Sequence, residues 1–371
     1  MGITPIIKPV STQCNLHCTY CYHGIHQENQ TKSKGVMSVE LTKRIIDEVS
    51  STSTRPIKLI WHGGEPLLAG IDYYQQIQDY QSLLTARTGR RYINAIQTNG
   101  TLLTEKSVDF LLNNKWGIGI SLDGPQMIHD NLRKTRTNKG SFAAIKTGID
   151  RIKSRGGEFT LNAVITRYSI NYSEEIFYFL LGLSKRFDIS PLVHPTATDS
   201  NSVFCLQPKE FGRFATEFFD FWWRLDDPSI RIRCLENAVI AAMGATPNLC
   251  SLSGECAKYI AFDSNGDVYP CGRFVGNENF RLGNIESSSL REIINNPTLR
   301  EFEREILESA RKCKECDWFF ACHSGCTYDK HKSGEAVLER TPLCQDTRML
   351  FSHARRRVMG IRGDFIRAMN C

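Results

Sequence analysis

The chain has 371 residues, a formal net charge of +6, 41% hydrophobic residues and 23% charged residues. This composition is ordinary for a globular protein, and the length predicts two domains or one large α/β unit with an appendage. The sequence lacks the long apolar run of a membrane span and the charged and apolar segments of an export signal. A mild positive charge does not by itself indicate nucleic-acid binding.

Fourteen cysteines in a chain without an export signal argue against a disulfide framework and for metal or cluster ligands in a reducing cytoplasm. The first three, Cys14, Cys18 and Cys21, follow an apolar segment in a CxxxCxxC pattern, with Tyr20 before the last. Three thiols cannot complete the four-thiolate site of a 4Fe–4S cluster, so we expect one iron open to an outside ligand, as in catalytic metal sites. A zinc knuckle or a set of buried free thiols is the alternative.

Strand-like and helical segments alternate over the first two hundred residues. The predicted strands are residues 5–10, 57–62, 92–98, 117–122, 160–166 and 189–194. The predicted helices are residues 39–50, 73–86, 106–113, 141–153 and 174–185. Six β/α repeats in this order predict an α/β fold with a parallel sheet, here an open partial (β/α)6 barrel. In such barrels the chemistry gathers at the C-terminal ends of the strands.

Polar and glycine-rich motifs follow three of these strands directly. They are Gly63-Gly64-Glu65-Pro66, Gln97-Thr98-Asn99-Gly100 and Ser121-Leu122-Asp123-Gly124. Glycines allow close approach of a ligand, and the amide, hydroxyl and carboxylate groups suit a polar one. Taken singly, each motif equally fits a strand-to-helix turn.

The middle of the chain is predicted to be helical. Residues 208–225 carry aromatic side chains at helical spacing, which favours packing against the barrel, and a second helix covers residues 234–243. We therefore expect a barrel domain at residues 1–200, a helical linker at 201–245 and a cysteine-rich domain with a terminal helix at 246–371. Cys205 and Cys234 fit no cluster pattern.

The last part holds a predicted hairpin, residues 259–263 and 267–270 around Ser264-Asn265-Gly266, and eight further cysteines. These are Cys250, Cys256, Cys271, Cys313, Cys316, Cys322, Cys326 and Cys344. Eight thiols suffice for two four-thiolate clusters, and two zinc ribbons are the alternative. Residues 345–369 read as a basic helix with a solvated face; RNA binding has no supporting motif there.

The cysteine loop, the strand-end motifs and the later cysteine spacing together resemble a radical S-adenosylmethionine (SAM) enzyme with a SPASM domain. The resemblance implies three 4Fe–4S clusters and SAM as cofactors. Cys14, Cys18 and Cys21 would hold the catalytic cluster. Cys250, Cys256, Cys271 and Cys326 would hold one auxiliary cluster, and Cys313, Cys316, Cys322 and Cys344 the other. The SAM site would comprise Tyr20, Gly63, Gly64, Glu65, Pro66, Gln97, Asn99, Ser121, Asp123, Arg133 and Val164.

Within this class the chain resembles the anaerobic sulfatase-maturating enzymes, which oxidise a cysteine or serine of a sulfatase to formylglycine. It departs from them in the pocket. Where that branch has an aspartate after the hairpin cysteine, this chain has Gly272, followed by Arg273. Where it has a tyrosine and a glutamine, this chain has His23 and His62. Glycine cannot take a proton, so His23 and His62 are the candidate catalytic bases.

These signs predict an enzyme that modifies a ribosomally made peptide or protein by hydrogen abstraction with a 5′-deoxyadenosyl radical. A side-chain crosslink, a C–C cyclophane or a thioether, is the preferred reaction. Formylglycine generation is the first alternative, and a non-catalytic zinc or RNA-binding protein is the second. The expected partners are a peptide or protein substrate, possibly with a leader sequence, and a flavodoxin or ferredoxin as electron donor. No membrane or nucleic-acid partner is expected.

Overall fold

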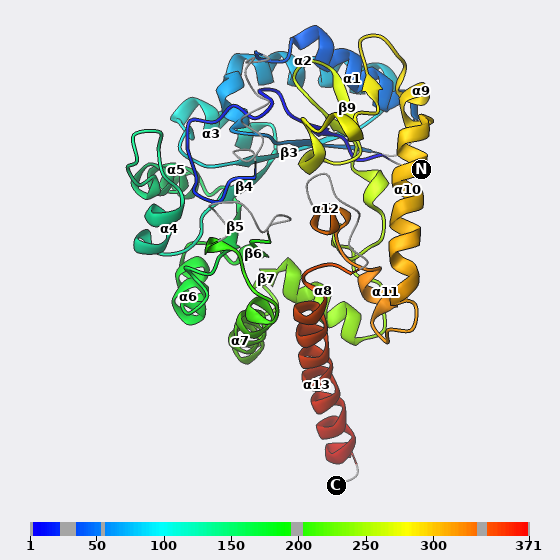
Figure 1. Cartoon of the computed structure of the whole chain (residues 1–371). Helices are drawn as coiled ribbons and strands as arrows, with labels where there is room; N and C mark the ends of the chain where they lie inside the picture. Colours follow the sequence, from blue (N-terminus) through cyan, green and yellow to red (C-terminus); the bar gives the residue numbers. More distant parts are fainter. Residues whose placement is uncertain (1–2, 23–34, 53–55, 194–202, 332–339, 370–371) are drawn as a thin grey trace. The chain divides into compact units, whose positions relative to one another are not determined.

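The computed structural model describes residues 3–22, 35–52, 56–193, 203–331 and 340–369 (Figure 1). The chain forms two compact units. The first unit comprises Met1–Leu122, His129–Thr160 and Ala257–Glu303, and the second comprises Asp123–Ile128, Leu161–Cys256 and Arg304–Cys371. The predicted boundaries at residues 200 and 245 follow chain order and stay a prediction.

The first unit is built on a largely parallel set of strands. They are β1 (Ile6–Ile7), β2 (Ile57–Trp61), β3 (Tyr92–Thr98), β4 (Gly117–Ser121), β8 (Ala261–Phe262), β9 (Asp267–Tyr269) and β10 (Gly283–Asn284). Their order is β10-β9-β8-β1-β2-β3-β4. The steps from β1 to β4 are parallel, and β8, β9 and β10 form antiparallel pairs. The predicted hairpin is confirmed, and its first strand extends the sheet by pairing with β1 in parallel.

Four helices of this unit follow the strands as predicted: α1 (Val39–Thr52), α2 (Ile71–Thr88), α3 (Glu105–Asn113) and α5 (Phe142–Ser154). A fifth, α9 (Leu290–Ile294), was not predicted. Two further helices, α4 (Gln126–Leu132) and α10 (Pro297–Ala310), contain residues of both units. Apolar residues at helical spacing, such as Ile45, Ile46 and Val49 of α1, are fully buried. The Thr104 side chain caps α3 by accepting from the Ser107 N–H.

The second unit contains the strands β5 (Thr160–Ile165), β6 (Arg186–Pro191) and β7 (Arg231–Ile232), which pair in parallel in that order. Its helices are α6 (Ser173–Leu183), α7 (Glu210–Leu225), α8 (Arg233–Ala242), α11 (Phe319–Cys322), α12 (Thr327–Lys330) and α13 (Cys344–Met369). The aromatic stripe of α7 is core packing, as predicted, because Phe214, Phe218 and Phe219 are buried. The Phe218 ring lies 5.0 Å from the Phe177 ring of α6.

The terminal helix α13 packs against α7 and α8. The Gly212 N–H donates to Asp346 Oδ1 at 2.8 Å, and His353 Nε2 lies 2.7 Å from Asp220 Oδ1. The cationic side chain of Arg357 also reaches Asp220, at 2.7 Å. These contacts hold the part of α13 from Asp346 to Arg357 against α7.

Most predicted elements agree with the structure to within two or three residues. The sixth strand begins at Arg186 rather than residue 189, and its predicted last residue lies outside the described part of the chain. The sequence analysis assigned no helix to Pro297–Ala310, where α10 lies. Among the helices that the structure describes, none has the length and apolarity needed to span a membrane.

Candidate functional site: a cysteine loop and a four-cysteine pocket

The loop that carries the first three cysteines is anchored by its backbone within the first unit. The His17 N–H donates to the Lys134 carbonyl at 2.7 Å, and the Thr19 N–H donates to the Leu132 carbonyl at 2.9 Å. The Arg136 guanidinium donates to the Cys14 carbonyl at 2.8 Å. A loop tied down this way holds its side chains in fixed directions, as a ligand loop must.

Asn99, at the end of β3, reaches the first cysteine. Its Nδ2 lies 3.6 Å from Cys14 Sγ and 2.9 Å from Asn15 Oδ1. The Leu16 N–H also points at Cys14 Sγ, at 3.4 Å. Burial raises the pKa of the Cys14 thiol, while these donors oppose that rise. A bound metal deprotonates a coordinating thiol, and the donors around Cys14 suit the resulting thiolate.

The Gly63-Gly64-Glu65-Pro66 turn is pressed against the segment just before Cys14. The Gly64 N–H donates to the Ser11 carbonyl at 3.0 Å, and the Glu65 N–H donates to the Gln13 carbonyl at 2.8 Å. A Cβ at position 64 would stand only 1.9 Å from the Gln13 carbonyl oxygen, and Gly63 has a φ of +123°. Both glycines are therefore required by close approach and backbone conformation rather than by chain flexibility alone.

The buried carboxylate of Glu65 links that turn to the end of β3. Its Oε1 accepts from the Leu67 N–H at 3.0 Å and from Thr98 Oγ1 at 2.8 Å. Its Oε2 accepts from the Asn99 N–H at 2.7 Å. Burial raises the pKa of Glu65 to about 7, although all three donors act in the opposite direction. Glu65 thus braces two of the predicted SAM-binding segments against each other.

Other residues predicted for the SAM site also pair within their own units. Gln97 Nε2 lies 3.1 Å from Ser121 Oγ at adjacent strand ends. The Arg133 guanidinium stacks 5.4 Å from the Tyr20 ring centre, and both side chains are buried. In the second unit, the Val164 N–H donates to the buried Asp123 Oδ1 at 2.9 Å. Whether these groups contact SAM remains a prediction.

The structure describes only one of the two predicted catalytic histidines. His23 lies outside the described residues. His62 follows β2, and its Nδ1 accepts from the Gly63 N–H at 2.7 Å. Burial, together with the nearby Lys8 ammonium, lowers the pKa of His62 to about 4. The ring is therefore neutral near pH 7, with its proton on Nε2.

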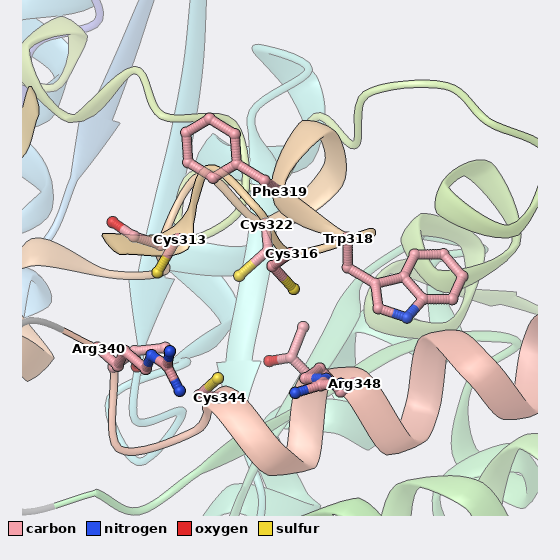
Figure 2. A pocket seen from close by; sticks show the side chains of 11 residues that line it. Cys313, Cys316, Trp318, Phe319, Cys322, Arg340, Cys344 and Arg348 are labelled. Atoms are coloured by element: carbon pink, nitrogen blue, oxygen red, sulfur yellow. The ribbon is translucent and has the colours of Figure 1, made fainter. Parts of the chain in front are cut away.

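In the second unit, four of the predicted cluster cysteines line one pocket. Figure 2 shows the sulfurs of Cys313, Cys316 and Cys322 on one side and that of Cys344, at the start of α13, facing them. The remaining wall is made of aromatic, hydroxyl and cationic residues: Trp318, Phe319, Ser324, Arg340, Thr341, Thr347 and Arg348.

This donor set fits an iron–sulfur cluster. Burial and the neighbouring cysteines raise the pKa of the Cys322 thiol to about 12, so four thiolates would not coexist here without a cationic centre. Iron supplies that charge, and Arg340 and Arg348 add positive charge at the rim. The predicted ligand set Cys313, Cys316, Cys322 and Cys344 thus lies around one cavity.

The other four predicted ligands are divided between the units. Cys271 follows β9 in the first unit, while Cys250, Cys256 and Cys326 belong to the second. Cys256 Sγ lies 3.3 Å from Thr327 Oγ1, next to Cys326. The assignment of these four thiols to one cluster remains a prediction.

Two buried lysines near the cysteines were missed by the sequence analysis. Lys8, just after β1, and Lys330, at the end of α12, are both fully buried. Lys330 Nζ donates to Ser309 Oγ at 2.7 Å and to Ser324 Oγ at 2.8 Å, and Ser324 lines the cysteine pocket. No sequence signal distinguishes them from surface lysines, since lysine is seldom fully buried.

Comparison with known proteins identifies this arrangement. The model of the radical SAM superfamily matches residues 9–177, and that of SPASM, an iron–sulfur cluster-binding domain, matches residues 254–317. A serine-type anaerobic sulfatase-maturating enzyme of Bacteroides thetaiotaomicron is 32% identical over 94% of this chain and 88% of its own length. The chain belongs to the radical SAM/SPASM enzymes. It therefore has the α/β fold of that family, a partial parallel sheet followed by a SPASM domain, and its cofactors are SAM and iron–sulfur clusters.

Further relatives agree with this placement. A cysteine-type anaerobic sulfatase-maturating enzyme of Clostridium novyi is 30% identical over 94% of both chains. The solved structure of native anSMEcpe with bound AdoMet has a TM-score of 0.88 at 27% identity, covering 96% of this chain and 98% of its own. SuiB of Streptococcus suis shares the fold, with a TM-score of 0.64 at 18% identity over 92% of this chain and 76% of its own.

Proposed function

We propose that this chain is a radical SAM enzyme that modifies a ribosomally made peptide or protein, and that its product is a side-chain crosslink. The peptide class is supported by two similar structures, of anSMEcpe with the Cp18Cys peptide and of SuiB with its precursor peptide SuiA. When bound, SAM and the clusters would supply a 5′-deoxyadenosyl radical for hydrogen abstraction from the substrate and would take up the electron left behind. The wealth of free cysteines is consistent with a reducing cytoplasm.

The cluster-holding groups follow from the ligand loops. Cys14, Cys18 and Cys21 would hold the catalytic cluster, with Asn99 and the Leu16 N–H directed at Cys14. Two auxiliary clusters would use the eight later cysteines. Glu65 keeps the Gly63–Pro66 turn and the β3 end together, so that the proposed SAM-binding backbone does not have to rearrange when SAM arrives.

The observation that carries the crosslink over formylglycine is the absence of a carboxylate at position 272. Forming an aldehyde from a cysteine or serine requires removal of the thiol or hydroxyl proton, for which a base is needed. Gly272 has no side chain, and a Cβ there would have Ile6 and Lys8 as its nearest neighbours. His62 is a poor substitute, because its Nδ1 is engaged by the Gly63 N–H and its Nε2 carries the ring proton.

A crosslink has the same overall balance as formylglycine made from serine, but its proton leaves a second side chain rather than the oxidised residue. One hydrogen atom passes from a substrate carbon to the 5′-deoxyadenosyl radical, giving 5′-deoxyadenosine. The carbon radical then bonds to a neighbouring side chain, which loses a proton while one electron leaves the product. Two hydrogens are lost in all, and no oxygen atom is gained.

The test uses anaerobically reconstituted enzyme, SAM, a chemical reductant and a pool of synthetic peptides. We expect 5′-deoxyadenosine together with peptides that have lost two hydrogens and resist fragmentation between the linked residues. Formylglycine from serine also loses two hydrogens, so an aldehyde-reactive hydrazide distinguishes it. The formylglycine function, favoured by the sulfatase-maturating relatives, is the second candidate. Hydrazide-reactive products would establish it and overturn the crosslink.

A further inference from the structure

The Lys8 side chain lies between Gly63 and Gly272 in the first unit. A Cβ at Gly63 would lie 3.4 Å from both Cβ and Cγ of Lys8, and a Cβ at Gly272 would lie 3.8 Å from its Cε. The side chain is fully buried. The stem is thus held beside the Gly63–Pro66 turn, and its charged end lies beside the residue that follows Cys271.

The end of this side chain is a buried cation that lacks a hydrogen-bond acceptor among the residues that the structure describes. Lys8 Nζ makes no hydrogen bond there. It lies over the aromatic ring of Tyr22, 6.0 Å from the ring centre. Burial lowers the pKa of Lys8 to about 8, with Asp263, Cys271 and Cys21 acting to raise it. An ammonium carries three donors, and burying it without acceptors is costly.

A second donor belongs to the same neighbourhood. The His62 N–H donates to the Ile7 carbonyl at 2.9 Å, and the Lys8 stem lies beside Gly63, so His62 is a neighbour of Lys8. The Lys8 ammonium accordingly lowers the pKa of His62. Since Nδ1 of His62 already accepts from the Gly63 N–H, the neutral ring presents Nε2–H as a donor. The Lys8 ammonium and the His62 Nε2–H are both hydrogen-bond donors, so an anion or another strong acceptor would suit them. Neither group acts as a base in this state.

A first side-chain carbon can be added at Gly272 without a clash. A Cβ there would meet its nearest atoms, on Ile6 and Lys8, at 3.5, 3.6 and 3.8 Å, which are ordinary contact distances. Gly272 is also absent from the positive-φ glycines, so a side chain is tolerated by the backbone. A carboxylate attached at this point would come within hydrogen-bonding reach of Lys8 Nζ.

We propose that Lys8 binds a carboxylate carried by the substrate, so that this enzyme selects a peptide with an aspartate or glutamate beside the reacting residue. This inference rests on the proposed function and adds the substrate feature that the pocket recognises. Position 272 would be glycine because the carboxylate arrives with the substrate instead of being resident in the enzyme. Charge-assisted hydrogen bonds to an ammonium are about twice as strong as neutral ones, which gives the pocket its selectivity.

The first test places a carboxylate in the site and needs no substrate. Gly272→Asp and Gly272→Asn are compared in the reconstituted holoenzyme, each with Lys8 and with Lys8→Met. We expect aspartate to favour folding over asparagine by about tenfold in the unfolding equilibrium when Lys8 is present, and by little when it is methionine. Equal effects of aspartate and asparagine in the Lys8 protein would overturn the proposal, even if the Lys8→Met chains fail to fold.

The second test measures ligand preference by calorimetry on SAM-loaded, unreduced holoenzyme, so that no turnover occurs. The probes are end-blocked pentapeptides, Gly-Gly-Asp-Gly-Gly and its asparagine counterpart. We expect the aspartate peptide to bind about tenfold more tightly, and Lys8→Met and Gly272→Asp to abolish that difference. The exposed Lys58 of β2 provides the control, since Lys58→Met should keep the preference.

Equal binding of the two peptides, including no binding of either, would overturn the carboxylate assignment. The outcome is separable from that of the proposed function. A carboxylate preference without 5′-deoxyadenosine formation would count against the radical chemistry alone. Peptide modification without such a preference would count against the role of Lys8 alone.

Discussion

Replacing Glu65 by glutamine tests whether one buried carboxylate braces the predicted SAM site. Glutamine can keep the two hydrogen bonds to Oε1, from Leu67 and Thr98. It would turn its NH2 group toward the Asn99 N–H, which now donates to Oε2 at 2.7 Å. One charge-assisted hydrogen bond is lost and two buried donors face each other. We therefore expect a loss of about 3 kcal/mol in the free energy of unfolding.

The assay is anaerobic urea unfolding of the reconstituted protein at about pH 8, where Glu65 is mainly ionised because its pKa is about 7. Equilibrium dialysis with labelled SAM accompanies it, and we expect weaker SAM binding because the turn and the β3 end lose their common acceptor. Glu40→Gln, at an exposed site in the first turn of α1, is the matched control. If Glu65→Gln unfolds and binds SAM like Glu40→Gln, the bracing role is refuted.

Three further predictions concern the glycine turn, the buried lysine of the second unit and the cysteine pocket. Gly64→Ala should abolish SAM binding and reduce iron incorporation, because its Cβ would lie 1.9 Å from the Gln13 carbonyl oxygen. Gly182→Ala is the control and should do neither, because its Cβ would have no atom within 4 Å. Lys330→Met should lower the reduction potential of an auxiliary cluster, because it removes a buried positive charge that Ser324 links to the pocket. A potentiometric titration followed by electron paramagnetic resonance measures this potential. The exposed Lys314→Met should leave that potential in place, and a shift of equal size there would contradict the account. Cys344→Ser should reduce bound iron and sulfide, while Cys205→Ser, at a buried thiol that does not line the pocket, should not. Unchanged iron in Cys344→Ser would remove that residue from the ligand set.

The regular part of the fold was predictable because its signals are local. The spacing of apolar residues predicts the strand over residues 92–98 and the helix that begins near Glu105. The parallel pairing of β8 with β1 was not predictable, because it joins residues about 255 positions apart through backbone bonds that carry no side-chain signature. The helix Pro297–Ala310 went unassigned, although its apolar residues do segregate to one face.

The candidate site also contains some residues that the sequence predicts and others that only the structure identifies. Cysteine spacing predicted the four thiols that line the pocket, since metal ligands leave a pattern in sequence. The role of Glu65 as a brace was visible only in three dimensions, because its partners lie two and more than thirty residues away. Lys8 sits between a short strand and a proline, and nothing in that context indicates that its ammonium is buried.

The most direct measurement of the central claim is mass spectrometry of a sulfatase-type peptide after anaerobic incubation with reconstituted enzyme, SAM and reductant. Gly272→Asp is run beside the wild type, with Gly182→Asp as a control for added charge. The account predicts 5′-deoxyadenosine from the wild type but no hydrazide-reactive peptide. Formylglycine in the wild-type reaction would contradict it, because the chemistry would then proceed without a carboxylate at position 272.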